Sequence, residues 1–311
     1  MIKPVLITLA AVLLGACVSA PEQRPAALLQ GERFLEMGVQ SFRADDYANA
    51  ATHFTRALDH YLGLDHQPGI LHSRINLAET ALAVGNGAAA ERHLRAARPL
   101  AGAAEADRLQ LLHSSVALWQ GRPDQAVELL APLLERVPPG TGLHRSALAN
   151  RSAAALARND ADAAAWVERY AAALHGVEGG ALVGRLHRFR AELARRSGDA
   201  AAAAAALQQA LAAYKAIPDR PGTAATLEQW AVLLMDGQHW DEAEDRLQRA
   251  LHIRLWLLAR RDTVADLRRL AAVSEARGQP QRAAAQRRWA EIVAGAGPVD
   301  WAALQQEVLP Q

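Results

Sequence analysis

The chain has 311 residues, with 34 Lys and Arg against 33 Asp and Glu, and its formal net charge at pH 7 is +1. This balance leaves no overall field that would draw the protein to nucleic acid or to anionic lipid surfaces. Hydrophobic residues make up 51% of the chain and aromatic residues only 5%, and much of the apolar content is alanine, the strongest helix former. We therefore expect closely packed helices and no nucleic-acid partner.

Residues 1–16 have the order of a secretory signal. Lys3 supplies a positive charge, and the apolar run from Val5 to Leu14 has only Thr8 as a polar break. Because a membrane-spanning helix needs about 20 apolar residues and this run is roughly half that length, a permanent span is not expected. We expect residues 1–16 to be removed.

Cys17 is the only cysteine in the chain, so it has no partner for an internal disulfide or a CxxC motif. The residues Leu14-Gly15-Ala16-Cys17 resemble the lipobox of bacterial lipoproteins. This resemblance implies cleavage before Cys17, a diacylglycerol on its thiol and acylation of the new amino terminus, and several acyl chains together make membrane attachment lasting. The following residue is Val18 and not Asp, which in this family implies the outer membrane rather than the inner one.

The segment from the cysteine onward, residues 17–30, predicts a flexible tether. It contains Pro21 and Pro25 and shows little periodicity before Ala26. At about 3.3 Å per residue its extended reach is at most some 40 Å, so the folded body would lie close to the membrane and rotate freely. The alternative is an ordinary secretory signal cleaved among the small residues 16–20, which would leave a soluble periplasmic protein.

Residues 31–297 carry an internal repeat. Tyr47, Ala50, Phe54 and Ala57 follow at steps of three, four and three, so they share one helical face. The small residue of each second helix recurs every 36 to 40 residues, at Ala50, Ala90, Ala126, Ala164, Ala203, Ala243 and Ala283. We therefore predict an all-α superhelical solenoid of about seven helix-turn-helix units.

The order of aromatic, small, large apolar and small residues resembles the tetratricopeptide repeat over residues 31 to 294. The period is about 39 residues against 34 in that family, and Glu168 and Arg287 stand where a large apolar residue is expected. Residues 298–311 begin with Pro298 and predict a short capping helix over the last unit. Turns within the units are expected at Gly87, Gly121, Asn159-Asp160, Gly198-Asp199, Gly237 and Gly278.

In the tetratricopeptide family the first helices of successive units line a concave wall where peptides bind. Carried over by position, the resemblance implies a wall that includes Asn76, Arg108, Asn150, Arg185, Arg188 and Arg268. The Lys/Asn pattern with which some members clamp a terminal carboxylate is not reproduced, so that specificity does not carry over.

A charged stripe on the first helix of the fifth unit is the strongest candidate contact. Its members, mostly at steps of three and four, are Arg185, Arg188, Glu192, Arg195 and Arg196. Guanidinium groups bind carboxylates bidentately, so one interpretation is a surface for an acidic segment of a partner. The other is a solvated face that pairs with acidic residues of the protein itself, such as Glu228.

No motif for catalysis or cofactor binding is recognised in the sequence. The segment 137–146, VPPGTGLHRS, lacks the lysine of a phosphate-binding loop, and neither GxSxG nor HExxH is present. Four histidines that lie close together in the chain are His53, His60, His66 and His72. No carboxylate completes a metal site with them, so a solvated surface is the simpler interpretation. We expect no enzyme activity, metal, cofactor or small-molecule substrate.

These observations favour a non-catalytic scaffold or adaptor, lipid-anchored at the bacterial outer membrane and facing the periplasm. It would bind peptide segments of other envelope proteins and serve the assembly or maintenance of an outer-membrane or cell-wall complex. The alternative is a periplasmic ligand- or peptide-binding regulatory module. A closed aromatic pocket around Trp230 or Trp256 would favour the alternative, whereas core packing is the simpler interpretation of the tryptophans.

Overall fold

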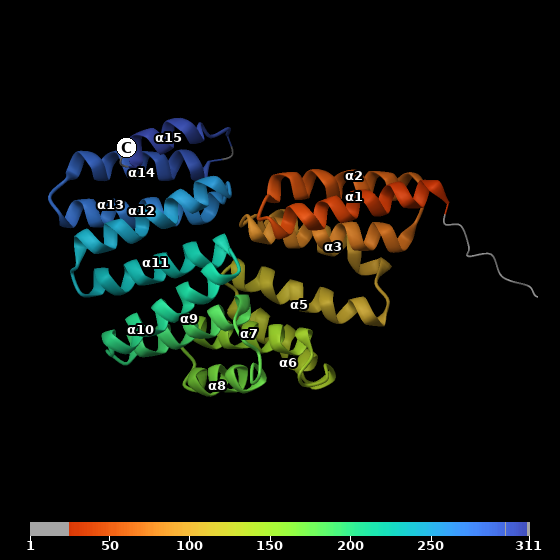
Figure 1. Cartoon of the computed structure of the whole chain (residues 1–311), viewed down its shortest axis with the longest axis horizontal. Helices are drawn as coiled ribbons and strands as arrows, with labels where there is room; N and C mark the ends of the chain where they lie inside the picture. Colours follow the sequence, from red (N-terminus) through yellow and green to blue (C-terminus); the bar gives the residue numbers. More distant parts are fainter. Residues whose placement is uncertain (1–24, 296, 310–311) are drawn as a thin grey trace, which may run out of the picture.

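The computed structural model describes residues 25–295 and 297–309. Cys17, the predicted signal at residues 1–16 and most of the predicted tether lie outside these residues. Fifteen α-helices and one short 3₁₀ helix account for all regular structure within them (Figure 1). No helix in this part of the chain is both long and apolar enough to span a membrane.

The helices form seven hairpins in chain order, which confirms the predicted all-α solenoid. The first helices are α1 (Ala26–Arg43), α3 (Gln67–Ala83), α5 (Ala103–Trp119), α7 (Gly142–Arg158), α9 (Gly180–Arg196), α11 (Arg220–Asp236) and α13 (Arg260–Ala276). The second helices are α2 (Tyr47–Gly63), α4 (Gly87–Ala97), α6 (Pro123–Arg136), α8 (Ala163–Ala173), α10 (Ala200–Ala216), α12 (Trp240–Trp256) and α14 (Pro280–Ala294). A 3₁₀ segment, η1 (Arg98–Leu100), extends α4, and α15 (Trp301–Val308) follows the last hairpin.

The first hairpin begins earlier than the sequence indicated. Helix α1 starts at Ala26, so residues 26–30 belong to this hairpin and not to the expected tether. Leu28 packs against the buried cluster of α2 that contains Phe54 and Tyr61, and removing its side chain from water favours helix over a free linker. The His60 ring also contacts the carbonyl oxygen of Ala27 at 2.5 Å.

One left-handed residue stands in the turn within each hairpin. These residues, with φ between 57° and 80°, are Asp45, Gly85, Gly121, Asn159, Gly198, Gln238 and Gly278. In the second and sixth hairpins they replace the expected Gly87 and Gly237. Gly87 serves close packing instead, because a Cβ atom there would lie 2.1 Å from Cε3 of Trp119.

The small residues that mark the repeat lie where two helices approach closely. At most 1% exposed are Ala50, Ala90, Ala126, Ala203, Ala243 and Ala283. In the fourth hairpin Ala163 is buried and Ala164 is exposed, so the predicted register there was wrong by one residue. Val167 and Tyr170 follow Ala163 on one face and are fully buried. In this register Val167, and not Glu168, occupies the large apolar position, so the fourth hairpin matches the repeat there. Consecutive alanines hid this register because they give no periodic signal.

The seventh hairpin keeps its departure from the repeat. Arg287 is exposed and pairs with Glu275, while the neighbouring Gln286 is 1% exposed and accepts a hydrogen bond from Ser274 Oγ at 2.8 Å. Leu304 and Val308 of α15 are buried in the apolar cluster of the sixth and seventh hairpins. The final helix therefore covers apolar surface of the sixth and seventh hairpins.

Tyr214 of α10 packs directly between the backbones of two first helices. A Cβ atom on Gly184 of α9 would lie 2.7 Å from its ring, and one on Gly222 of α11 would lie 2.3 Å from it. Tyr61 of α2 makes equivalent contacts in the first two hairpins. A large ring at the position of Tyr61 and Tyr214 thus requires glycine on both flanking first helices.

The solenoid curves until the turns of its first three hairpins meet turns of its later hairpins, near the ends of α1, α2 and α12 (Figure 1). Tyr47 is buried there together with Leu257 and Ala259. Asp45 accepts a hydrogen bond from the backbone nitrogen of Arg220 at 3.2 Å. We call this contact between residues 42–47, 83–88 and 119 on one side and residues 218–220 and 253–261 on the other the seam.

Candidate functional site

A groove runs across the first helices of hairpins one to three. Its cavity measures about 460 Å³ and is lined by Leu35, Glu36, Val39, Gln40, Arg43, His72, Asn76 and Arg108. The side chains come from α1, α3 and α5, so three successive hairpins build one surface. Asn76 and Arg108, both expected on the partner-binding wall, lie together here. We call this surface the first-helix groove.

The first-helix groove combines three kinds of contact. Leu35 and Val39 are apolar, and the amides of Gln40 and Asn76 supply both donors and acceptors. Arg43 is exposed. Arg108 donates from Nη2 to Glu79 Oε1 at 2.7 Å and from Nε to the same oxygen at 3.2 Å, and this ion pair positions its guanidinium at the edge of the groove. This mixture suits an extended peptide, whose backbone bonds to amides while its side chains take apolar or charged contacts.

The predicted stripe lies on α9, and three of its members bond to one another. Glu192 accepts from Arg195 at 3.0 Å and from Arg196 at 2.7 Å. Arg195 also reaches Asp236 of the next hairpin at 2.8 Å, whereas Arg196 reaches Asn159 of the preceding hairpin at 2.9 Å. Burial raises the pKa of Glu192, but the hydrogen bonds from both arginines outweigh burial and hold that pKa below its ordinary value. This half of the stripe therefore ties hairpins four, five and six together.

The other half of the stripe, Arg185 and Arg188, makes fewer contacts with the rest of the protein. Arg188 donates to the side chain of Gln229 at 3.3 Å, and the Gln229 amide donates to the Arg188 carbonyl oxygen at 2.9 Å. Arg185 is exposed and forms no ion pair with the described residues. Glu228, the acidic residue considered as a partner of the stripe, pairs instead with Arg254 and Arg269.

Two further residues of the predicted wall lie in different surroundings. Asn150 is 6% exposed, and its amide nitrogen donates to Ser114 at 3.0 Å and to Ser115 at 2.8 Å. It joins hairpins three and four in the interior, so its predicted place on an accessible wall is wrong: a polar amide between packed helices must bond to other buried groups. Arg268 is exposed on α13 beside the seam, far from Asn76 along the chain.

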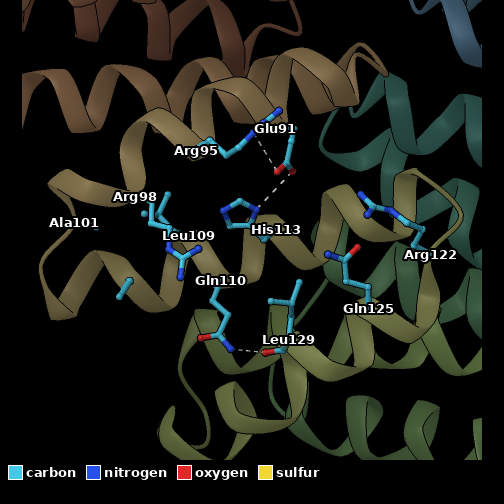
Figure 2. A pocket seen from close by; sticks show the side chains of 11 residues that line it. Glu91, Arg95, Arg98, Ala101, Leu109, Gln110, His113, Arg122, Gln125 and Leu129 are labelled. Atoms are coloured by element: carbon cyan, nitrogen blue, oxygen red, sulfur yellow. Dashed lines mark hydrogen bonds and ion pairs between the residues drawn. The ribbon is translucent and has the colours of Figure 1, made fainter.

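A second cleft, which we call the outer cleft, lies at hairpins two and three and is lined by α4, η1, α5 and α6 (Figure 2). It was not among the sites predicted from the sequence. Its volume is about 690 Å³, and its polar lining includes Glu91, Arg95, Arg98, Gln110, His113 and Arg122. The available signal was Pro99, which ends α4 in a 3₁₀ turn, so that the chain continues through an extended Ala101 before α5.

The outer cleft has an excess of positive charge. Glu91 pairs with Arg95 at 3.6 Å and lies 3.6 Å from Nδ1 of His113, as Figure 2 shows. Burial lowers the pKa of His113, and Arg98 lowers it further against the opposing effect of Glu91, so the imidazole is neutral near pH 7. Three arginines then face a single carboxylate, an arrangement that binds anions.

A buried ion cluster joins hairpins six and seven. Arg254, 4% exposed, pairs with Glu228 and with Asp266 Oδ1 at 2.5 Å, and Arg269 pairs with Glu228 at 2.7 Å. Burial raises the pKa of Asp266 to about 7, although Arg254 acts in the opposite direction. Because its members face one another and not a cleft, the cluster is a structural element.

The residues that suggested other chemistry have local roles. His66 accepts at Nδ1 from the Gly69 backbone nitrogen at 3.1 Å and caps α3. Among residues 25–295 and 297–309, no three His, Cys, Asp or Glu side chains gather to hold a metal ion. Trp230 stacks on Arg246 at 5.0 Å, and Trp256, 52% exposed, stacks on Arg220 at 4.1 Å. These two tryptophans pair with arginines rather than with each other.

No protein-family model matches this chain, and no curated protein sequence matches it. Among solved structures, it is similar to a signal transduction ATPase with numerous domains, a STAND protein with a tetratricopeptide repeat sensor from Pyrococcus horikoshii, with 12% identity and a TM-score of 0.53. That alignment covers 89% of this chain and 43% of the Pyrococcus protein, so this chain spans less than half of its length. BtubC (BKLC) from P. vanneervenii is 17% identical over 89% of this chain and 95% of its own, with a TM-score of 0.37.

The seven hairpins and the likeness to the Pyrococcus protein define the class: this chain has a tetratricopeptide-repeat-like, all-α fold. Stacked repeats of this kind present extended surfaces.

Proposed function

We propose that this protein is a non-catalytic, lipid-anchored scaffold that binds protein partners in the bacterial cell envelope. The observation that carries the proposal is the first-helix groove, in which three successive hairpins contribute apolar, amide and cationic side chains to one surface. Peptide recognition on a repeat solenoid uses such a surface, since each repeat contacts a few residues of an extended segment.

The bound segment would run across α1, α3 and α5. Gln40 and Asn76 would bond to its backbone, and Leu35 and Val39 would contact an apolar side chain. Arg43 would attract an acidic residue, because a guanidinium binds a carboxylate through two parallel hydrogen bonds.

The anchor in this proposal is Cys17, within Leu14-Gly15-Ala16-Cys17. Acylation at this residue would hold the folded body at the membrane, and Val18 supports the outer membrane, on the periplasmic side. Attachment would confine the groove to the membrane surface and raise the effective concentration of partners in that membrane. Assembly or maintenance of an outer-membrane or cell-wall complex is the process that such a scaffold would serve.

A second candidate is a periplasmic ligand- or peptide-binding module with a regulatory role. The outer cleft favours it, because about 690 Å³ lined by Arg95, Arg98 and Arg122 suits a small anion as well as a peptide. The similar Pyrococcus protein is described as a signal-transduction protein whose repeats form a sensor.

The proposal is tested by placing a photo-crosslinking amino acid at Gln40 in the groove and, as a matched control, at exposed Thr55 on α2. Illumination of intact cells that express the full chain should join Gln40, and not Thr55, to the same membrane or periplasmic protein in repeated experiments. Arg43→Ala should reduce that adduct. Equal labelling from both positions would contradict the proposal, and a small anion recovered with the purified protein and lost in Arg98→Ala would support the regulatory alternative.

A further inference from the structure

A third cavity, of about 930 Å³, opens beside the seam between the early hairpins and the last one. Its first wall comes from the turn before α4, residues 84–88, and from Trp119 at the end of α5. Its second wall comes from α13 and the carboxyl end of α14, residues 258–268 and 293–295. We call this cavity the seam cleft. Both walls form one cavity only because the solenoid closes.

Three arginines line the seam cleft, and none of its lining residues is an aspartate or a glutamate. Arg260 donates to the carbonyl oxygens of Val293 at 3.1 Å, Gly295 at 2.7 Å and Gly297 at 2.9 Å. Arg261 donates to the carbonyl oxygen of Trp119 and stacks on its ring at 4.4 Å. Arg268 is exposed and makes no hydrogen bond or ion pair within the described residues.

Carbonyl oxygens position a guanidinium but do not neutralise it. Elsewhere in the solenoid, arginines at comparable junctions have carboxylate partners, such as Arg195 with Asp236 at 2.8 Å and Arg136 with Asp107 at 2.8 Å. The seam cleft thus concentrates positive charge without internal compensation, and a carboxylate entering it would gain charge-assisted hydrogen bonds.

The remaining lining is apolar. Leu258 is 45% exposed, Val84 is half-buried, and Trp119 forms part of the wall, whereas the lining residues Val264 and Val293 are buried. Anionic ligands without apolar groups would leave this surface in contact with water. A ligand that matches both features carries carboxylates and apolar side chains at short spacing.

We propose that the seam cleft binds an acidic peptide segment of a partner protein in which carboxylate and apolar side chains alternate. This site is separate from the first-helix groove and does not depend on it. The free guanidinium of Arg268 binds a carboxylate of the segment, and Leu258 and Val84 contact its apolar side chains. Because the segment touches both walls, it also stabilises the closed solenoid.

The test measures binding of a short fluorescein-labelled peptide of alternating glutamate and leucine to the full chain in detergent, by fluorescence anisotropy. Arg268→Ala should weaken binding about tenfold, the size expected when one hydrogen-bonded charge pair is lost. Ala88→Trp, at an exposed lining position, should block the cleft. Arg56→Ala is the matched control, because Arg56 is exposed on α2 and outside every cleft described above. Arg43→Ala controls for the first-helix groove.

Binding that depends on Arg268 and Ala88, and not on Arg56 or Arg43, supports the proposal, as does a rise in melting temperature on adding the peptide. Binding that is lost in Arg43→Ala but kept in Arg268→Ala places the peptide in the first-helix groove and overturns it. Equal weakening in Arg56→Ala shows only general charge attraction and also overturns it. Arg268-dependent binding of sodium dodecanoate without binding of the peptide assigns the cleft to a fatty-acid carboxylate instead.

Discussion

Asp45 and Arg220 are 175 residues apart in the sequence, yet Asp45 Oδ2 accepts from the Arg220 backbone nitrogen at 3.2 Å and lies 3.5 Å from its guanidinium. Asp45 is the left-handed residue of the first hairpin turn, with φ 57°. The same carboxylate accepts a hydrogen bond from Tyr47 at 2.9 Å through its other oxygen. One turn residue therefore helps to close the solenoid.

Apolar burial, more than this ion pair, should hold the seam. The Arg220 side chain is 44% exposed, and exposed pairs contribute about 1 kcal/mol or less. Tyr47 is 7% exposed, so Tyr47→Ala should lower the free energy of unfolding by about 3 kcal/mol and increase the radius of gyration measured by small-angle X-ray scattering. Leu62→Ala, at a residue that is 49% exposed, is the control and should change neither quantity. An unchanged radius for Tyr47→Ala would show that the closed shape does not depend on this contact.

The packing of Tyr214 against helix backbones predicts a sharp difference between two glycines. Gly222→Ala should destabilise the protein by about 1–3 kcal/mol, because the new Cβ would lie 2.3 Å from the Tyr214 ring. Gly142→Ala, at the first position of α7 with no atom within 4 Å, should be neutral or stabilise by about 0.4–1 kcal/mol. Urea denaturation followed by circular dichroism measures both effects, and equal values for the two variants would disprove the close approach.

The buried ion cluster predicts a pH-dependent variant. Arg254→Met should destabilise by about 3–5 kcal/mol near pH 7, because Asp266 and Glu228 would lose a buried cation. In the wild type Arg254 and Arg269 hold the pKa of buried Glu228 below its ordinary value, and without Arg254 burial raises that pKa. Glu228 of the folded variant therefore takes up a proton before that of the wild type, and the deficit should shrink as the pH falls from about 7 to about 5. Arg269→Met, whose side chain is 34% exposed, should cost about 1 kcal/mol or less. A deficit that grows on acidification would be inconsistent with this assignment.

The two halves of the stripe should respond differently to charge reversal. Arg196→Glu should destabilise by about 1–3 kcal/mol, because Arg196 bonds to Glu192, Asn159 and the Leu156 carbonyl oxygen. Arg185→Glu should change the free energy of unfolding by no more than about 0.5 kcal/mol, since Arg185 is exposed. Thermal unfolding distinguishes them, and loss of a crosslinked partner in folded Arg185→Glu would identify that part of the stripe as a contact.

Lipidation predicts a change in fractionation. Cys17→Ser should leave an unprocessed precursor or release the folded body from the membrane fraction, because the acylated thiol would be absent. Metabolic labelling with a palmitate analogue and immunoblotting of fractions measure both outcomes. A mutant that fractionates and migrates like wild type would disprove the anchor.

Features that depend on neighbouring residues could be predicted from the sequence. The spacing of Tyr47, Ala50, Phe54 and Ala57 indicated one face of a helix, and the recurrence of this pattern indicated about seven hairpins. Both could be predicted because helical periodicity depends only on residues close together in the sequence. The same reasoning failed at Ala164, because consecutive alanines do not show which of them faces the neighbouring helix.

Only the tertiary structure decided which polar residues of the first helices are accessible and which are bonded inside the protein. Asn150 has the sequence position of a wall residue, but the serines opposite it on α5 make it a buried link. Arg196 and Arg268 are both arginines on first helices, yet the first is bound by neighbours on two hairpins and the second faces an open cleft. The seam depends on small rotations between successive hairpins, which add from the first hairpin to the sixth and bring Asp45 to Arg220. No local pattern encodes that sum, because each rotation depends on how whole helices pack.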